Sequence, residues 1–198
     1  MSRVTERPRG REAVVAALVE SARRLVAERG PADVSLREIA DDAKVNFGLV
    51  YQYIGTKDQL LEIVYRTTSE ATAAAIGSAA TLADAVDLLL QRGDGTAARL
   101  IAWSVLESGG SDDLSPWSST ALDALVDLAQ KDALSEDRTI SREDGQVFAA
   151  LTVATAIGWR LFGSMSLAAV QLDPADRERH TILVRKMIRR LADDLTAG

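Results

Sequence analysis

The chain of 198 residues contains no cysteine and only one histidine, His180. The absence of cysteine excludes disulfide bonds and thiolate metal sites. His180 lies two residues after Glu178, whereas a helical di-metal carboxylate site needs a Glu-x-x-His spacing and a second histidine. The sequence also has no glycine-rich phosphate loop and no GxSxG nucleophile motif. We therefore expect no catalytic residue, no bound metal and no cofactor.

A signal-like N-terminus is missing, and we find no apolar run that is long enough to span a bilayer. The longest apolar-rich stretch, residues 147–170, predicts a buried helix, because five polar side chains interrupt it: Thr152, Thr155, Arg160, Ser164 and Ser166. The hydrophobic content of 47% is typical of a soluble globular protein. We expect a cytoplasmic protein without a membrane partner.

Residues 35–61 carry the most informative local pattern. Ser35 is followed three residues later by Glu38, which is the spacing of a capping box, so a helix is expected to begin near Leu36. Apolar residues then recur at three- and four-residue spacing, at Leu36, Ile39, Ala40 and Ala43. The pattern predicts a short amphipathic helix.

A second short helix is predicted after a turn at Lys44 and Val45, with Asn46 as its N-cap. Its inward side is expected to contain Leu49, Val50 and Tyr53, and its outer side Asn46, Phe47, Gly48, Tyr51 and Gln52. Gly48 costs such a helix about 1 kcal/mol relative to alanine. Its presence indicates that something approaches the backbone closely, and a DNA phosphate or base edge is one candidate.

Gly55 ends the second helix, and Thr56 with Gln59 repeats the capping-box spacing, so a third helix is expected to begin at Lys57. The N-terminus of this helix combines backbone amides, partial positive charge and a lysine, and such an end binds phosphate. Two short helices around a turn, followed by a capped third helix, are the pattern of a DNA-reading domain.

These residues resemble the DNA-binding domain of the TetR family of bacterial transcriptional regulators. The resemblance covers about residues 11–66 and is carried by Glu28-Arg29-Gly30, Val34-Ser35-Leu36-Arg37-Glu38-Ile39-Ala40, Val45-Asn46-Phe47-Gly48-Leu49-Val50-Tyr51-Gln52-Tyr53 and Thr56-Lys57-Asp58-Gln59-Leu60-Leu61. It implies that the helix from Asn46 to Tyr53 lies in the DNA major groove, that Tyr51 and Lys57 hold phosphates, and that the rest of the chain binds a ligand and dimerises.

Two positions depart from the pattern of that family. Lys44 stands where a glycine is common in the turn, and Ile54 stands where an aromatic residue is common after the recognition helix. Lys44 offers an additional phosphate contact at this turn.

Base reading is expected from Asn46, Phe47, Gly48 and Gln52. Phe47 makes only apolar contacts, for example with a thymine methyl group, so the discriminating hydrogen bonds fall to Gln52 or Asn46, which suit adenine. Contacts that position the protein on phosphates are expected from Ser35, Arg37, Lys44, Tyr51 and Lys57.

The charge is unevenly distributed along the chain. The formal net charge is -6, but residues 1–66 contain eleven basic and ten acidic residues, while residues 67–198 carry a net charge of -7. Residues 1–10 are predicted to be a flexible basic arm, because Arg3, Arg7, Arg9 and the adjacent Arg11 are opposed by Glu6 alone. Such an arm suits a DNA backbone or minor groove, and it equally fits a solvated tail. The modest positive charge of one DNA head implies modest affinity, so a dimer with two heads is expected.

Every element that the sequence predicts is a helix. We expect an all-α fold with a helix-turn-helix DNA-binding domain at residues 11–66 and a helical effector-binding and dimerisation domain at residues 67–198. The first helix is expected from Arg11 to Arg29, and further helices at about Leu82 to Gln91, Thr96 to Glu107, Pro116 to Ala133, Arg142 to Val170 and Pro174 to Leu195.

The last two helices are predicted to form the surface of a homodimer. The final helix has a stripe of Val184, Ile188, Leu191 and Leu195, with Leu183 and Met187 beside it. The preceding helix has a stripe of Val147, Leu151, Ala154, Gly158, Leu161 and Met165. Two such helices from each chain make a four-helix bundle of the kind that the family uses. Periodicity alone also allows the stripes to fill the core of a single chain.

A pocket for a small apolar effector is expected in the second domain, lined by Trp103, Leu106, Trp117, Leu122, Phe148, Trp159, Phe162 and Met165. Ordinary core packing of these side chains is the alternative.

We predict a DNA-binding regulator, a repressor released from a palindromic operator by a small apolar ligand. The alternatives are a helical protein-interaction adaptor and a regulator without small-molecule control. The adaptor leaves Lys44, Tyr51, Gln52 and Lys57 unexplained as a group.

Overall fold

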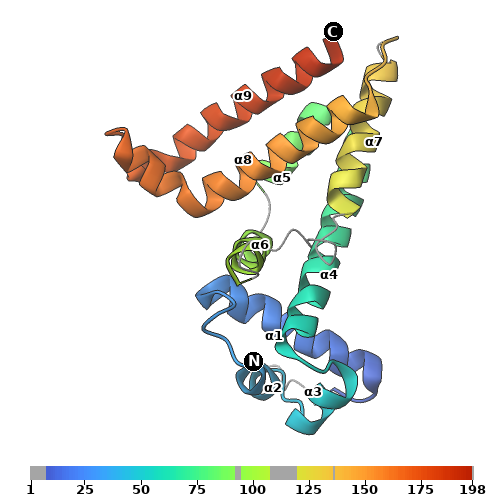
Figure 1. Ribbon diagram of the computed structural model, residues 1–198, viewed down its shortest axis with the longest axis vertical. Helices are drawn as coiled ribbons and strands as arrows, with labels where there is room; N and C mark the ends of the chain where they lie inside the picture. Colours follow the sequence, from blue (N-terminus) through green and yellow to red (C-terminus); the bar gives the residue numbers. More distant parts are fainter. Residues whose placement is uncertain (1–7, 92–94, 108–119, 136, 198) are drawn as a thin grey trace, which may run out of the picture. The chain divides into compact units, whose positions relative to one another are not determined.

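The computed structural model describes residues 8–91, 95–107, 120–135 and 137–197, and the regular elements in these ranges are all helices (Figure 1). The predicted all-α class is confirmed. The helices are α1 (Arg11–Arg29), α2 (Leu36–Asp42), α3 (Phe47–Tyr53), α4 (Lys57–Gly77), α5 (Leu82–Gln91), α6 (Thr96–Glu107), α7 (Thr120–Ser135), α8 (Arg142–Ala169), the short 3-10 helix η2 (Pro174–Asp176) and α9 (Arg177–Ala197).

At the described helix ends, the predicted bounds agree with the observed bounds within a few residues. The predicted start at Pro116 lies outside the described residues. At the last helix, Asp173 accepts a hydrogen bond from the Ala175 amide and caps a 3-10 turn that contains Pro174, and α9 begins only after this turn. Proline lacks a backbone amide, so its place in the first turn costs no hydrogen bond.

The described residues form two compact units. The first unit consists of the described residues within 1–68 and 94–118, and the second of the described residues within 69–93 and 119–198, so α4 begins in the first unit and ends in the second. This division differs from the predicted domain boundary in one element, α6. Leu100 of α6 is fully buried in the core of the first unit, where Ile101 and Trp103 also pack, and the Thr96 hydroxyl donates a hydrogen bond to the Arg23 carbonyl at 3.4 Å.

The core of the first unit is built on the predicted face of α1. Val14, Leu18, Ala22 and Val26 are buried there. They pack in one cluster with apolar residues of α2, α3 and α4, including Ile39, Ala40, Val50, Leu60, Leu61 and Val64. Contacts join α1 to α2, α2 to α3 and α1 to α3, so the two short helices are supported both by each other and by α1. Isolated seven-residue helices are unstable in water, and this shared core holds them.

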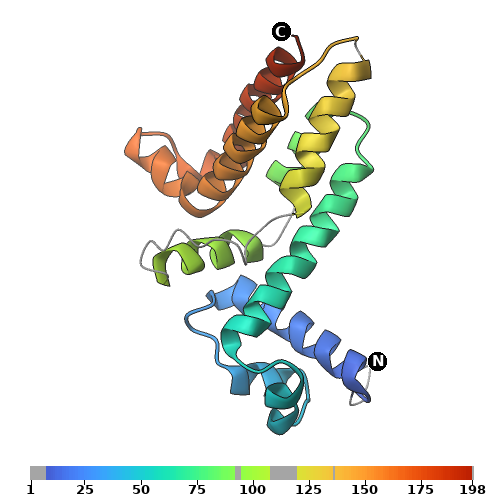
Figure 2. The same ribbon diagram turned by 45° about the vertical axis from the view of Figure 1, so that its right-hand side comes forward.

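The second unit is a bundle of α5, α7, α8 and α9. Its buried cluster contains Leu82, Val86, Leu125, Ala129, Phe148 and Ile188. Helices α8 and α9 lie side by side and run in opposite directions (Figures 1 and 2). Arg189 of α9 and Asp87 of α5 form an ion pair at 3.1 Å.

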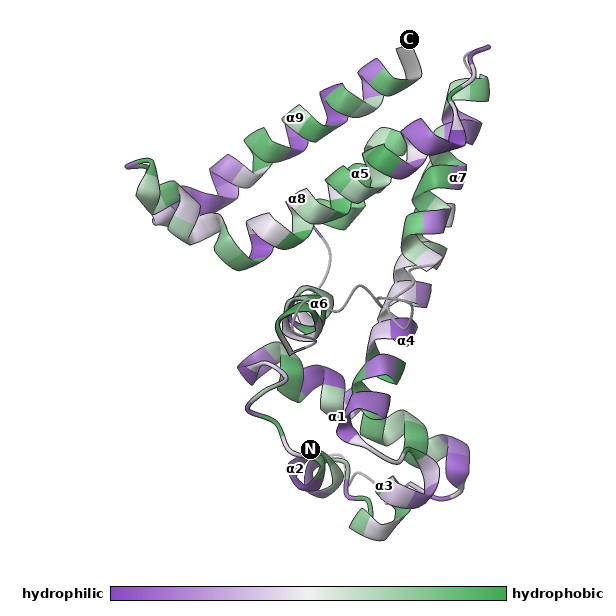
Figure 3. Cartoon of the chain, in the orientation of Figure 1, coloured by the Kyte–Doolittle hydropathy of each residue, from purple (hydrophilic) through white to green (hydrophobic). Residues whose placement is uncertain are grey.

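The prediction that residues 147–170 form a buried helix is wrong for this chain. On α8, Phe148, Ala149, Thr152 and Leu167 face the core, whereas Val147, Leu151, Phe162 and Met165 are exposed. Figure 3 shows hydrophobic residues along the length of α8. The helix is apolar around most of its circumference, but the bundle covers only one side of it.

The expectation that no apolar run could span a bilayer also needs correction. By length and composition α8 is long and apolar enough to cross a membrane. Most of the interruptions in its sequence are hydroxyl side chains, which do not exclude such a segment. The core helices of soluble bundles pass the same test, so this property by itself is weak support for a membrane helix.

Candidate nucleic-acid interface

The beginning of α2 is held by the predicted capping box. The Ser35 hydroxyl accepts a hydrogen bond from the Glu38 amide at 3.2 Å, and the Glu38 carboxylate accepts one from the Ser35 amide at 2.9 Å. Both terminal nitrogens of Arg29 donate to the same carboxylate at 3.1 Å. The Ser35 backbone amide, the Ser35 hydroxyl and Arg29 together lower the pKa of Glu38 to about 2. Glu38 is therefore ionised and engaged within the protein.

The turn between α2 and α3 is a Schellman motif built on Lys44. The Val45 amide donates to the Ala40 carbonyl at 2.9 Å, and the Lys44 amide donates to the Asp41 carbonyl at 3.1 Å. The motif requires a left-handed residue, and Lys44 supplies it with a φ of 55°. Glycine adopts this conformation without the steric cost that a Cβ atom adds, which explains why the family pattern has glycine here. Lys44 keeps the left-handed backbone and differs from that pattern only in its side chain. The lysine side chain is exposed at the turn.

The N-cap of α3 gives a structural role to Asn46 and Gly48, two of the predicted site residues. The Asn46 side-chain oxygen accepts a hydrogen bond from the Gly48 amide at 2.8 Å. A Cβ atom added to Gly48 would lie 3.3 Å from that oxygen, which is tighter than an ordinary contact. Glycine at this position thus has a local reason within the chain, in addition to any close approach of DNA.

Helix α3 separates an inner from an outer side as predicted. Val50 is fully buried, and Leu49 and Tyr53 pack against the core at partial exposure. Tyr51 is 60% exposed and Gln52 is also exposed. Phe47 differs from the prediction of an outer residue, because it is half-buried and packs against the core.

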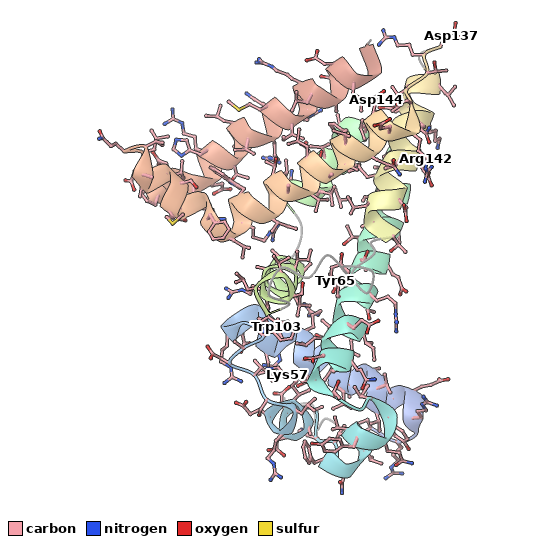
Figure 4. The ribbon with its side chains drawn as sticks, viewed as in Figure 1. Lys57, Tyr65, Trp103, Asp137, Arg142 and Asp144 are labelled. Carbon is pink, nitrogen blue, oxygen red and sulfur yellow. The ribbon has the colours of Figure 1, made fainter. Side chains whose placement is uncertain are left out.

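The junction between α3 and α4 depends on Gly55. Its φ is 102°, and a Cβ atom there would lie 2.2 Å from the Gln59 side-chain oxygen. That oxygen accepts a hydrogen bond from the Thr56 amide at 2.9 Å, and the Thr56 hydroxyl accepts one from the Gln59 amide at 3.3 Å. The predicted capping box is confirmed, and it places Lys57 in the first turn of α4 (Figure 4).

A buried serine of α1 anchors the end of α2. The Ser21 hydroxyl, 4% exposed, donates a hydrogen bond to the Asp42 carboxylate at 2.5 Å. The same carboxylate forms an ion pair with Arg24. The hydrogen bond from Ser21, followed by that from Arg24, lowers the pKa of Asp42. Sequence reasoning missed this support, and its only signal was a serine inside the apolar face of α1.

The nine predicted DNA-contacting residues all lie in the segment that runs from the α2 cap to the first turn of α4. Seven of them are exposed, and two are half-buried, namely Phe47 and Lys57. Arg23, Arg24 and Arg29 of α1, in contrast, pair with carboxylates of the first unit. The exposed segment offers hydrogen-bond donors and positive charge, which are what a phosphate backbone and base edges require.

The eight residues predicted to line an effector pocket do not form one cluster. Trp103 and Leu106 belong to the first unit, where Trp103 packs against the core (Figure 4) and Leu106 is 79% exposed. Trp117 lies outside the described residues. In the second unit Leu122 and Phe148 pack in the core, Phe162 and Met165 are exposed, and the Trp159 indole donates a hydrogen bond to the Thr181 hydroxyl at 2.8 Å.

Comparisons with known proteins agree with this architecture. Residues 18–64 match the family model described as bacterial regulatory proteins, tetR family. A transcriptional repressor of the HTH type from Mycobacterium tuberculosis is 32% identical over 190 residues, which cover 94% of this chain and 93% of that protein. A transcriptional regulator of the HTH type from Mycobacterium bovis matches with the same identity and coverage.

Two solved structures show the same fold at lower identity. Salmonella enterica GusR has a TM-score of 0.66 at 18% identity and covers 93% of this chain and 96% of its own. A TetR-family transcriptional regulator from Rhodococcus has a TM-score of 0.66 at 15% identity and covers 92% of this chain and 98% of its own. The chain belongs to the TetR family of bacterial regulatory proteins, and it is a helix-turn-helix transcriptional regulator rather than an enzyme.

Proposed function

We propose that this protein is a cytoplasmic repressor that binds a palindromic operator as a homodimer and is released from it by a small apolar ligand. The observation that carries the DNA part is the exposed segment from α2 to the first turn of α4, with Gln52 and Tyr51 outward on α3. Regulators of this family bind DNA and act as dimers.

Within that segment Gln52 is the strongest candidate for reading a base. Bidentate recognition of adenine needs both the oxygen and the nitrogen of a side-chain amide. The Asn46 oxygen already accepts a hydrogen bond from the Gly48 amide, which fixes the orientation of this side chain in the cap, so Asn46 is less free than Gln52 to align both of its groups with adenine. Gln52 is exposed, and among the described residues no hydrogen bond engages its side-chain amide, so both groups can face DNA.

Phosphate positioning falls to Lys57, Lys44, Arg37, Tyr51 and the Ser35 helix start. Lys57 lies in the first turn of α4, a helix of 21 residues whose backbone amides add to its charge. A contact of this kind is the same for every sequence and depends on salt, because it releases counterions from the DNA.

The DNA assignment is tested by comparing Gln52→Ala with Lys57→Ala on an operator selected from a library of random duplexes. Lys57→Ala should weaken binding to operator and random DNA alike and reduce the salt slope by about one per contact. Gln52→Ala should change the preference among sequences, with a loss of about 1 to 3 kcal/mol at the base pair that it reads. Equal losses on operator and random DNA for both variants would contradict the division, and a wild-type protein that prefers no sequence would contradict the proposed function.

We assign the dimer surface to the exposed sides of α8 and α9. Val147, Leu151 and Met165 of α8 and Leu183, Met187 and Leu191 of α9 are exposed apolar side chains. Val184, Ile188 and Leu195 of the predicted stripe instead pack in the core of their own chain. Some residues of the predicted stripes therefore fill the core of their own chain, and the others remain exposed for a dimer contact. A second copy of the chain covers the exposed ones.

The effector site is proposed in the core of the second unit, near Phe148 and Thr152. Thr152 is fully buried, and its hydroxyl has no hydrogen-bond partner among the described residues. An unpaired buried hydroxyl costs free energy that a ligand with one polar group recovers. Leu122 and Phe148 supply apolar surface in the same core.

A thermal-shift screen of small apolar metabolites tests this site, since a ligand that binds only the folded state must raise Tm. Thr152→Val is the matched variant, because it keeps the shape of the side chain and removes the hydroxyl. It should fold normally and respond less to the ligand. A panel without any shift, or an equal response of both proteins, would overturn the proposed site.

A further inference from the structure

Phe47 connects α2 and α3 through two ring contacts on the DNA-facing side. The guanidinium carbon of Arg37, on α2, lies 5.0 Å from the centroid of the Phe47 ring. The Tyr51 ring, one turn further along α3, meets the same ring edge to face, with centroids 5.1 Å apart and planes at 82°. One aromatic side chain therefore contacts two of the predicted phosphate-binding residues.

The Phe47 side chain is held by the core, whereas the side chains of Arg37 and Tyr51 lie at the surface. It is half-buried and packs against the core of the first unit, while Arg37 is exposed and Tyr51 is 60% exposed. An arginine over an aromatic ring is attracted by the negative face of the ring and keeps its N–H groups directed outward. An edge-to-face pair of aromatic rings is likewise a preferred geometry.

Arg37 also differs from the neighbouring arginines in its ion pairing. Arg24 pairs with Asp42 and Arg29 pairs with Glu38, so two of the three carboxylates of α2 are already engaged, and no ion pair joins the third, Asp41, to Arg37 among the described residues. Within the described ranges Arg37 has no carboxylate partner. The ring of Phe47 thus orients a guanidinium without neutralising it, which leaves the whole charge for a phosphate.

From these contacts we infer that Phe47 is a positioning residue, which holds Arg37 and Tyr51 ready for phosphates instead of reading a thymine methyl group. The inference rests on the proposed DNA-binding function and deepens it. Ordering two exposed side chains before binding removes part of the entropy cost of complex formation. A leucine at position 47 would fill the core and provide neither ring contact.

The first test needs no DNA. In NMR spectra of the full-length protein, the side-chain δ and ε protons of Arg37 should be shifted upfield by the ring current of Phe47. The shift should disappear in Phe47→Leu and remain in Phe47→Tyr, while thermal unfolding shows that both variants are folded. Unshifted Arg37 protons in the wild type would overturn the inference whatever the protein binds.

The second test measures affinity for the selected operator. Phe47→Leu should weaken binding about two- to five-fold, the size of an exposed cation–π contact, and Phe47→Tyr should restore it. The effect of Phe47→Leu should shrink in an Arg37→Ala background, because the variants disrupt one unit. Arg66→Ala, which removes an exposed arginine of α4, is the matched control and should leave the effect of Phe47→Leu unchanged.

An operator in which deoxyuridine replaces thymine separates positioning from base reading. If Phe47 contacts a thymine methyl group, loss of that methyl should weaken the wild type and leave Phe47→Leu unaffected. Such coupling, or additive effects of Phe47→Leu and Arg37→Ala, would overturn the positioning role. A wild type that binds no duplex selectively would instead refute the proposed function and leave the NMR result to decide the geometry.

Discussion

The hydroxyl of Ser21 on α1 donates a hydrogen bond of 2.5 Å to the carboxylate of Asp42, the last residue of α2. The two residues are 21 positions apart in the chain, and the bond ties the scaffold helix to the helix-turn-helix. Because Ser21 is buried and Asp42 is charged, this contact is stronger than an ordinary surface hydrogen bond.

Replacing Ser21 by alanine should therefore lower the free energy of unfolding by about 1 to 3 kcal/mol. The measurement is urea-induced unfolding followed by circular dichroism. Ser78→Ala removes an exposed hydroxyl that donates a hydrogen bond to the Ala75 carbonyl, and it should have little effect. Equal stabilities of the two variants would mean that the Ser21–Asp42 contact does not support the fold.

Acidification should destabilise the DNA-binding unit through Glu38. Its pKa is about 2 in the folded protein against 4.5 for the unperturbed group, so the unfolded chain binds the proton more readily. The stability supplied by the ionised carboxylate is complete above about pH 4.5 and is lost as the pH falls towards 2. The lowered pKa of Asp42 acts in the same direction.

The control for this pH dependence is Glu38→Gln, which keeps a side-chain oxygen for the Ser35 amide and removes the charge. Unfolding curves between pH 5 and about 2.5 should fall less steeply for the variant than for the wild type. Parallel curves would show that Glu38 has no part in the acid sensitivity.

Lys44→Gly should raise the stability of the first unit and weaken DNA binding at the same time. Glycine relieves the cost of a side chain at a φ of 55°, a gain of about 0.5 to 1 kcal/mol after the larger entropy of the unfolded glycine is included. Lys44→Gln keeps the strained backbone and removes the charge, so it should weaken binding without a gain in Tm. A Lys44→Gly protein less stable than Lys44→Gln would contradict the role of the left-handed turn.

Charged substitutions on the exposed side of α8 should dissociate the proposed dimer. Leu151→Glu and Met165→Glu place a carboxylate where a second copy would bury an apolar side chain, and burial of an unpaired charge is costly. Light scattering coupled to size exclusion should report monomers. Leu134→Glu alters a residue of α7 that is 63% exposed, and it should leave the dimer intact. Dimers in all three variants would place the interface elsewhere.

The sequence alone determined where the helices of the DNA head begin and end. Ser35 with Glu38, and Thr56 with Gln59, mark helix starts that the structure confirms, because a capping box is formed by residues three positions apart and needs no partner from elsewhere. The same local spacing, together with the motifs around Tyr51 and Lys57, was sufficient to predict the fold class and the family.

The tertiary structure decided which neighbour each side chain meets. Periodicity shows that α8 is apolar, but only the packing of the bundle shows that Phe148 is buried while Leu151 is exposed. Trp103 belongs to the core of the first unit, and Phe47 contacts Arg37 and Tyr51, because α6 packs on α1 and α2 contacts α3. Such contacts depend on the arrangement of elements that are distant in the chain, and a local pattern of residues does not contain that information.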